Sequence, residues 1–250
     1  MARKKNPQQS DNSFGAIRQS RRKAIHAGLM TEVEPLSDNQ KRIFDSWKAG
    51  KNLFIYGCAG TGKTFCALYN ALQDTIGDNP KYDSVYVVRS LVATREIGFL
   101  PGTHEDKADI YQIPYKNMVK YMFELGNDTE FETLYTGLKK QDSVKFWSTS
   151  FLRGVTLDNA VIIIDEMQNL SFHELDSIIT RVGENSRIVF AGDAMQSDLI
   201  KDRERNGIYD FMDILRNMPD DFDMIEMGVD DICRSGLVRN YLIAKHETGF

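Results

Sequence analysis

The stretch Gly57-Cys58-Ala59-Gly60-Thr61-Gly62-Lys63-Thr64 decides the fold class of this 250-residue chain. It fits the pattern G-x-x-x-x-G-K-[ST], and it stands between the apolar run Leu53 to Tyr56 and a helical pattern that begins at Lys63. Glycines let successive backbone N–H groups point inward without a Cβ clash, and the N-terminus of the following helix adds a positive dipole end. The stretch therefore predicts a triphosphate-binding loop, a P-loop, between a strand and a helix.

The P-loop predicts both the nucleotide contacts and half of a metal site. We expect Lys63 to neutralise the β- and γ-phosphates and Thr64 to place its hydroxyl on Mg²⁺. The predicted cofactors are ATP and Mg²⁺. The residues of this stretch that we expect to contact the nucleotide are Gly57, Cys58, Ala59, Gly60, Thr61, Gly62, Lys63, Thr64 and Phe65.

A second acidic site follows the four aliphatic residues Val161 to Ile164. Ligands bind at the carboxyl ends of strands in open α/β sheets, so we expect Asp165 to hold Mg²⁺ through the water shell of the ion, while Thr64 contacts the ion with its hydroxyl. Glu166 is the candidate general base for the attacking water. The alternative, a strand followed by an ordinary acidic turn, is disfavoured by the upstream P-loop. We expect this strand to neighbour the strand that leads into the P-loop.

A third run, Ile188 to Ala191, ends in Gly192-Asp193-Ala194-Met195-Gln196. Gln196 is a candidate to sense or orient the water and the γ-phosphate. The alternative is a turn initiated by Asp193, and the pattern favours neither interpretation.

Short apolar runs alternate with amphipathic stretches over most of the chain, which predicts an α/β fold with a parallel sheet covered on both faces. Ser37 is the expected N-cap of the first helix, which ends at Gly50. The segment from about 92 to 157 breaks the alternation and is interpreted as an insertion. We expect strands at 52–56, 84–89, 160–164, 187–191 and 223–227, and helices at 63–73, 175–182, 208–215 and 237–245.

The insertion carries aromatic residues interleaved with Lys116 and Lys120. Such a pattern could stack single-stranded bases, but a helix that packs its own face gives the same pattern, and we favour packing. The aromatic residues concerned are Tyr111, Tyr115, Tyr121 and Phe123.

Composition excludes several classes of protein. Apolar residues make up 42% and charged residues 27% of the chain, which is typical of globular proteins and excludes full disorder, collagen and coiled coil. No apolar run is long enough to span a membrane. Three cysteines make no disulfide framework and suggest a reducing compartment. The cysteines lack C-x-x-C spacing, which argues against a zinc site.

Charge is divided unevenly along the chain. Residues 1–30 hold seven basic residues and one acid, Asp11, giving +6 and leaving −11 for the rest of a chain whose net charge is −5. We interpret residues 1–33 as a flexible basic arm without the apolar core of a secretory signal. The arm is either a polyanion-binding tail or a solvated terminus, and charge alone does not separate the two.

With these sites in order, the sequence resembles superfamily-1-type helicases and is most similar to the PhoH family of P-loop ATPases, including the short versions carried by bacteriophages. The resemblance runs from about Leu36 to His246, and Gly98-Phe99-Leu100-Pro101-Gly102 is its most family-specific stretch. Other matching stretches are Leu36–Gln40, Val88–Ser90, Arg153–Leu157, Ile164–Asn169, Thr180–Gly183, Gly192-Asp193 with Gln196, and Asp231–Ser235.

The resemblance implies one RecA-like P-loop NTPase domain over residues 34–250. Its expected architecture is a three-layer sandwich with a mostly parallel central sheet and a helical insertion. Gln40 is similar to the adenine-reading glutamine of helicases, and Arg234 to an arginine finger. Arg181 is a weaker second candidate, and no role is assigned to Arg153. The family further implies a homohexameric ring and a cytoplasmic location, in the host cell if the chain is phage-encoded.

The sequence also departs from these relatives. Ala194 replaces a proline that many helicases carry, and Ser90 is followed by Leu91 where many PhoH proteins have proline. Superfamily-1 helicases use two RecA-like domains, whereas about 215 residues here form one. We therefore expect Arg234 to lie at a sheet edge, away from its own P-loop, and to serve the next subunit of a ring.

Two functions remain open. The leading hypothesis is an ATPase that acts as an ATP-dependent RNA or DNA helicase, coupling hydrolysis to movement on RNA or single-stranded DNA. The alternative is an ATP-dependent assembly or regulatory protein without helicase activity, which the acidic body favours because it would repel a polyanion.

Overall fold

The fold is given by a computed structural model that describes residues 29–77, 79–90, 104–123, 125–152, 154–193 and 202–248, with backbone only for 104–111 and 202–206. The basic arm up to residue 28, the stretch Gly98 to Gly102, Arg153 and Gln196 lie outside the described residues. The elements in chain order are α2 (Asp38–Lys48), β1 (Asn52–Gly57), α3 (Lys63–Thr75), β2 (Ser84–Arg89), α4 (His104–Met122), α5 (Asp128–Lys140), β3 (Val144–Ser148), α6 (Thr149–Leu152), β4 (Ala160–Asp165), η2 (Met167–Asn169), α7 (Phe172–Ile179), β5 (Arg187–Gly192), α8 (Asp202–Arg216), β6 (Phe222–Met227), η3 (Val229–Asp231) and α9 (Gly236–Glu247).

Six strands form one sheet in the order β3-β2-β4-β5-β1-β6, and all of these pairs are parallel. The two central strands β4 and β5 are buried along their whole length. Continuous aliphatic runs such as Val161 to Ile164 suit this position because helices cover both faces of the sheet. The expected parallel sheet is confirmed.

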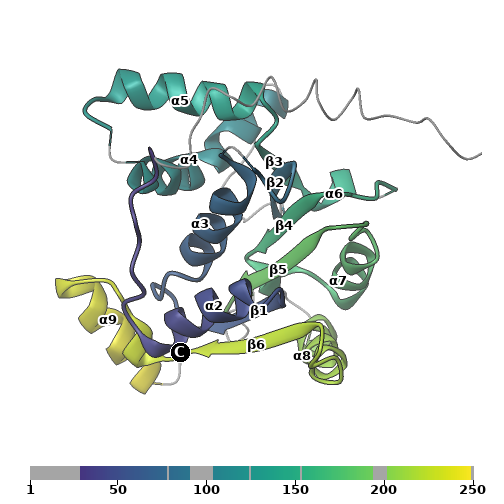
Figure 1. The fold of residues 1–250 in the computed structure, drawn as a ribbon. Helices are drawn as coiled ribbons and strands as arrows, with labels where there is room; N and C mark the ends of the chain where they lie inside the picture. Colours follow the sequence, from purple (N-terminus) through teal and green to yellow (C-terminus); the bar gives the residue numbers. More distant parts are fainter. Residues whose placement is uncertain are drawn as a thin grey trace, which may run out of the picture.

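Helices cover the sheet on both sides, and this gives three layers (Figure 1). Alternate strand residues face opposite cores: Leu53 and Ile55 pack with α2, α3, α4 and α5, whereas Phe54 packs with α6, α7 and α8. The rings of Phe190 and Phe211 close the second core, with centroids 5.2 Å apart. The expected three-layer sandwich is confirmed.

Helix α2 begins and ends where its sequence indicates. Ser37 is the N-cap, and its Oγ accepts a hydrogen bond from the backbone N–H of Gln40. The helix buries Ile43 and Trp47, and Gly50 leaves it with a φ of +85°. Helix α2 thereby lies beside β1 and β6, at the side of the sheet that carries the P-loop.

The segment at 92–157 contains an element that the sequence did not indicate. Strand β3 pairs in parallel with β2 and forms the edge of the sheet, so this segment supplies a strand as well as helices. Its sequence, Val-Lys-Phe-Trp-Ser, has no aliphatic run because an edge strand is covered less completely. Helices α4 and α5 lie together beside this edge (Figure 1).

Among the described helices, none combines the length and the apolar character that crossing a bilayer requires.

Candidate nucleotide-binding site

The P-loop runs from the end of β1 to the start of α3, and its backbone leaves no room for side chains at key points. Gly57 has a φ of +117°, and a Cβ there would lie 2.2 Å from the carbonyl oxygen of Met227 on β6. Gly62, with a φ of +84°, is the N-cap of α3, and no side chain caps the helix. The free N-terminal N–H groups of α3 are therefore directed toward the loop, as phosphate binding requires.

Lys63 folds back over the loop. Its Nζ donates hydrogen bonds to the carbonyl oxygens of Gly57 at 2.8 Å and Cys58 at 2.6 Å. Burial lowers the pKa of Lys63, while the carboxylates of Asp193 and Glu166 act in the opposite direction. An ammonium group held in such dry surroundings gains more from an anionic phosphate than an exposed one does.

Thr64 and Asp165 meet as expected. The Thr64 Oγ1 donates a hydrogen bond of 2.7 Å to Oδ1 of Asp165, which is only 8% exposed. The expectation that their strands are neighbours is wrong, because β5 lies between β1 and β4. The contact forms because α3 crosses this face of the sheet above β5, β4 and β2. A hydroxyl and a carboxylate are hard oxygen ligands, so the pair fits Mg²⁺. Proteins commonly bind this ion through one carboxylate together with the phosphates of the substrate.

Glu166 directly follows β4, and its backbone adopts the left-handed conformation with a φ of 53°. Its Oε2 accepts a hydrogen bond of 2.6 Å from Nε2 of Gln168. The Oε1 of Gln168 in turn accepts from the backbone N–H of Asp193 at 3.0 Å. Gln168 thus joins the ends of β4 and β5 beside the candidate base.

This role of Gln168 was missed from the sequence. Gln168 lies in the matching stretch Ile164–Asn169, but nothing in the sequence places its amide against the end of β5. In the structure, Gly192 makes room for this contact, because a Cβ there would lie 2.3 Å from Oε1 of Gln168. A glycine at the end of the apolar run of β5 is the only trace of this contact in the local sequence. Asp193 is buried at the end of β5, and Gln196 beyond it is not described, so its role stays a prediction.

Gln40 lies against the P-loop, as its similarity to the adenine-reading glutamine of helicases predicts, but both ends of its amide already form hydrogen bonds. Its Oε1 accepts from the backbone N–H of Leu36 at 2.8 Å, and its Nε2 donates to the carbonyl oxygen of Thr61 at 2.9 Å. The residue is 5% exposed. In this arrangement Gln40 supports the loop, and its reading of adenine stays a prediction.

The expectation that Arg234 lies away from its own P-loop is wrong. The backbone N–H and the Sγ of Cys233 both contact the carbonyl oxygen of Gly60, at 3.1 and 3.0 Å. A Cβ on Gly60 would lie 3.0 Å from Cγ of Arg234. The turn η3 that follows β6 brings this segment back over the loop, and Asp231 holds the turn through the backbone N–H of Gly228 at 2.7 Å.

Arg181 lies at the other end of the sheet. Its carbonyl oxygen accepts from the backbone N–H of Leu157, just before β4 begins, whereas Asp165 stands where β4 ends. A six-residue strand separates the two ends by roughly 20 Å. Arg181 is therefore not brought to the P-loop of its own chain.

The three cysteines gather around the P-loop although they are dispersed in the sequence. Cys58 lies in the loop, and a Cβ on Gly62 would be 3.7 Å from Sγ of Cys233 and 3.9 Å from Sγ of Cys66. Burial raises the pKa of Cys66 to about 12, so this thiol stays protonated. The Sγ of Cys58 lies 3.7 Å from Nδ1 of His246 on α9. Residues of α3 and of α9 therefore both lie next to the P-loop.

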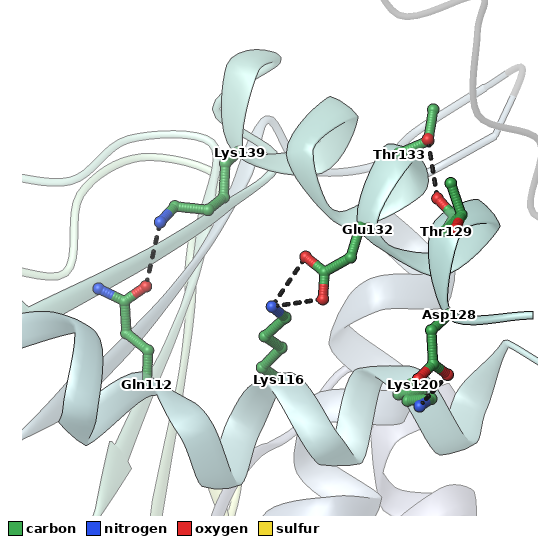
Figure 2. Close-up of polar contacts among 8 residues, drawn as sticks. All are labelled: Gln112, Lys116, Lys120, Asp128, Thr129, Glu132, Thr133 and Lys139. Carbon is green, nitrogen blue, oxygen red and sulfur yellow. Dashed lines mark hydrogen bonds and ion pairs between the residues drawn. The ribbon is translucent and has the colours of Figure 1, made fainter.

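Ion pairs between α4 and α5 engage the lysines of the insertion (Figure 2). Lys116 pairs with Glu132 at 2.7 Å, and Lys120 pairs with Asp128 at 2.6 Å. The favoured interpretation, packing rather than base stacking, holds for Tyr115 and Phe123, which are buried, while Tyr121 is 74% exposed. The side chain of Tyr111 is not described.

The parallel sheet, the P-loop on β1 and the acidic pair at the end of β4 define a P-loop NTPase with a RecA-like fold. The family model described as PhoH-like protein matches residues 32–245. The chain belongs to the PhoH-like protein family.

Curated relatives carry the same family name. A PhoH-like protein of Mycobacterium leprae is 33% identical over 219 residues, covering 86% of this chain and 59% of the relative. Protein PhoH2 of Bacillus subtilis is 36% identical over 145 residues, 58% of this chain and 32% of the relative. Protein PhoH of Escherichia coli is 31% identical over 196 residues, which cover 77% of this chain and 52% of the relative. The chain thus spans between a third and three fifths of these relatives.

Two solved structures align with most of this chain and with about half of their own length. The large terminase from a thermophilic bacteriophage, in complex with ADP, aligns with a TM-score of 0.46 and 12% identity, over 84% of this chain and 50% of the terminase chain. A Pif1 helicase from Bacteroides aligns with a TM-score of 0.41 and 18% identity, over 82% of this chain and 44% of the helicase chain.

Proposed function

We propose that this protein is a Mg²⁺-dependent ATPase whose hydrolysis is coupled to RNA or single-stranded DNA. The observation that carries the ATPase half is the meeting of Thr64, at the start of α3, with Asp165, at the end of β4, beside Lys63. Asp165 is 101 residues away from Thr64 in the sequence, and the two meet only at the carboxyl edge of the sheet. A phosphate clamp, a metal carboxylate and a candidate base in one place suit phosphoryl transfer to water.

The residues take the following roles in the proposed reaction. Lys63 and the N–H groups of the loop hold the β- and γ-phosphates, and Thr64 and Asp165 hold Mg²⁺, which supplies charge neutralisation on the phosphate oxygens. Glu166 accepts a proton from the water as its oxygen bonds to the γ-phosphorus, while the bond to the β-phosphate oxygen breaks and releases ADP and phosphate. Gln168 fixes the carboxylate of Glu166.

Arg234 is proposed to direct its guanidinium toward the phosphates of its own subunit. The stem of Arg234 lies against Gly60, and the residue is exposed beyond that contact. A guanidinium there can stabilise charge on the transferring group without a partner chain. The proposed roles of Gln40 on adenine and of Gln196 on the attacking water complete the site.

A homo-oligomer, a hexameric ring by resemblance, is supported by α9 rather than by Arg234. The helix buries none of its residues, and it exposes Leu237 at 85%, Val238 at 52% and Tyr241 at 63%. A second copy of the chain is the proposed partner of this face. Light scattering over a range of protein concentrations should give a mass several times the 28.5 kDa of one chain, and a mass equal to that of one chain would contradict the homo-oligomer.

Lys63→Ala tests the ATPase assignment. The variant should fold normally and lose ATP binding and turnover, because Lys63 supplies the ammonium in the P-loop. Release of phosphate measures turnover, and a fluorescent ATP analogue measures binding. Lys116→Ala is the matched control, because this lysine pairs with Glu132 on the helical insertion. Turnover by Lys63→Ala close to that of the unaltered protein would refute the assignment.

The second candidate, an ATP-dependent assembly or regulatory protein without helicase activity, is favoured by charge. The chain outside residues 1–30 carries −11, and Lys116 and Lys120 are paired with acids. Adding single-stranded RNA or DNA to the ATPase assay, with and without residues 1–30, separates the two. Stimulation that requires the arm and falls with salt supports the nucleic-acid function, with a slope of about −0.7 per phosphate contact. Turnover that nucleic acid leaves unchanged supports the second candidate.

A further inference from the structure

Hydroxyl groups hold both oxygens of the Asp165 carboxylate. Thr64 donates to Oδ1 at 2.7 Å, and the phenol of Tyr115 donates to Oδ2 at 2.6 Å. Tyr115 comes from α4, in the helical insertion, and is only 3% exposed. A hydrogen bond this short from a hydroxyl to a buried carboxylate is in the range of charge-assisted bonds, which are stronger than neutral ones.

Aromatic contacts fix the Tyr115 ring and the helix that carries it. Its ring lies against Phe146 of β3, with centroids 5.5 Å apart. Further along α4, the ring of Tyr121 meets Phe65 of α3 edge to face at 5.8 Å.

The neighbouring residues tie α4 to α5. Lys116 pairs with Glu132, and Lys120 pairs with Asp128, as Figure 2 shows. At the end of α4, the carbonyl oxygen of Met122 accepts from the backbone N–H of Thr31 at 2.9 Å. Tyr115 thus belongs to a pair of helices that contact each other, which we call the α4–α5 hairpin (residues 104–140). Contacts with α5 and with Thr31 hold in place the helix that carries its phenol.

We propose that Tyr115 is a positioning residue for the metal carboxylate. Its hydroxyl fixes the Asp165 side chain through Oδ2 and so leaves Oδ1 directed at Thr64, where the two oxygens together hold Mg²⁺. This step rests on the proposed function, which assigns Mg²⁺ to Thr64 and Asp165. Mg²⁺ demands near-ideal octahedral geometry, and the partners that orient its ligands matter to affinity. The hairpin thereby becomes part of the nucleotide site through one hydroxyl group.

Tyr115→Phe tests the proposal by removing that hydroxyl alone. The Mg²⁺ concentration that half-saturates ATP turnover should rise roughly tenfold. Calorimetric affinity for ATP should weaken in Mg²⁺ and stay unchanged in EDTA, which is a readout independent of turnover. Tyr121→Phe, on the same helix with an exposed ring, is the matched control and should behave as the unaltered protein does. An unchanged Mg²⁺ requirement, or a lower one, would overturn the proposal.

Two further variants separate positioning from packing. In an Asp165→Asn background, Tyr115→Phe should cause no additional loss of Mg²⁺-dependent ATP affinity, because the phenol acts through that carboxylate. A further loss would show that Tyr115 acts through packing and would overturn the proposal. If Tyr115→Phe folds poorly, Phe146→Leu, which loosens the ring but keeps the hydroxyl, should raise the Mg²⁺ requirement by a smaller factor. No change in that requirement would again refute it.

The same measurements distinguish this inference from the proposed function. If the unaltered protein binds ATP equally with Mg²⁺ and with EDTA and does not hydrolyse it, the proposed ATPase fails. If the unaltered protein shows a Mg²⁺ requirement and Tyr115→Phe shares it, only the role of Tyr115 fails.

Discussion

The P-loop site and the α4–α5 hairpin use polar groups in opposite ways. At the site, buried contacts join segments that are far apart in the sequence, such as Thr64 with Asp165 and Gln40 with Thr61. On the hairpin, the charged groups are exposed and pair with one another across two successive helices. Buried polar groups are costly to leave unpaired, whereas exposed ion pairs contribute little. Substitutions at the site should therefore have far larger effects than substitutions of these ion-paired residues on the hairpin.

After the loss of ATP binding and turnover expected for Lys63→Ala, the largest expected effect belongs to Arg234. Arg234→Ala should lower ATP turnover by about 10³-fold or more while the melting temperature stays nearly unchanged, because the residue is exposed and its charge acts on the transferring phosphate. Phosphate release under saturating ATP measures the loss. Arg239→Ala, an exposed arginine within α9, is the control.

Mixing variants shows which subunit Arg234 serves. If it acts on its own P-loop, mixtures of Lys63→Ala and Arg234→Ala subunits should stay inactive even when the subunits exchange. Recovery of activity in such mixtures would place the arginine at the site of a neighbouring subunit and would contradict the placement proposed from Gly60.

Glu166→Gln should lower turnover by about a hundredfold or more and leave ATP binding intact. The amide keeps the shape of the side chain but accepts no proton from the water. Rapid-quench measurement of the hydrolysis step checks the predicted fall in rate, and measurement of ATP affinity checks that binding is unchanged. A hydrolysis rate equal to that of the unaltered protein would assign the base to another residue.

Gln40→Ala should produce an intermediate effect and separate two roles for this amide. The substitution leaves the backbone N–H of Leu36 and the carbonyl of Thr61 without their partner, a cost of about 1–3 kcal/mol that should raise the KM for ATP about tenfold. If Gln40 only supports the loop, turnover of ATP and GTP should fall by the same factor. A selective loss with ATP would show that the amide also reads adenine.

The smallest effect is expected on the hairpin. Lys116→Met should change the free energy of unfolding by less than about 1 kcal/mol, because the pair with Glu132 is partly exposed and salt screens it. Chemical denaturation at low and high salt measures this. A loss of several kcal/mol, or a fall in ATP turnover, would show that the Lys116–Glu132 pair contributes more than an exposed ion pair normally does.

The sequence by itself determined the elements that build the sheet. Strand β2 has the bounds expected from its sequence, and β1, β4, β5 and β6 differ from expectation by one residue at one end. Continuous aliphatic runs identify strands that helices cover on both faces, and glycines with a lysine and a threonine identify a phosphate loop. Each of these signals lies within a few neighbouring residues, so it can be read without the fold.

Tertiary structure alone decided which distant groups meet. Tyr115 reaches Asp165 across 50 residues, Gln168 reaches Asp193 across 25, and Cys233 brings Arg234 to Gly60 across 173. The five residues of β3 include strand-favouring Val144 and Phe146 but no aliphatic run, and pairing with β2 places them at the edge of the sheet. Such contacts depend on strand order and on how helices cross the sheet, and no local pattern encodes either. The sequence determined the chemistry available at the P-loop, and the fold decided which residues hold it in place.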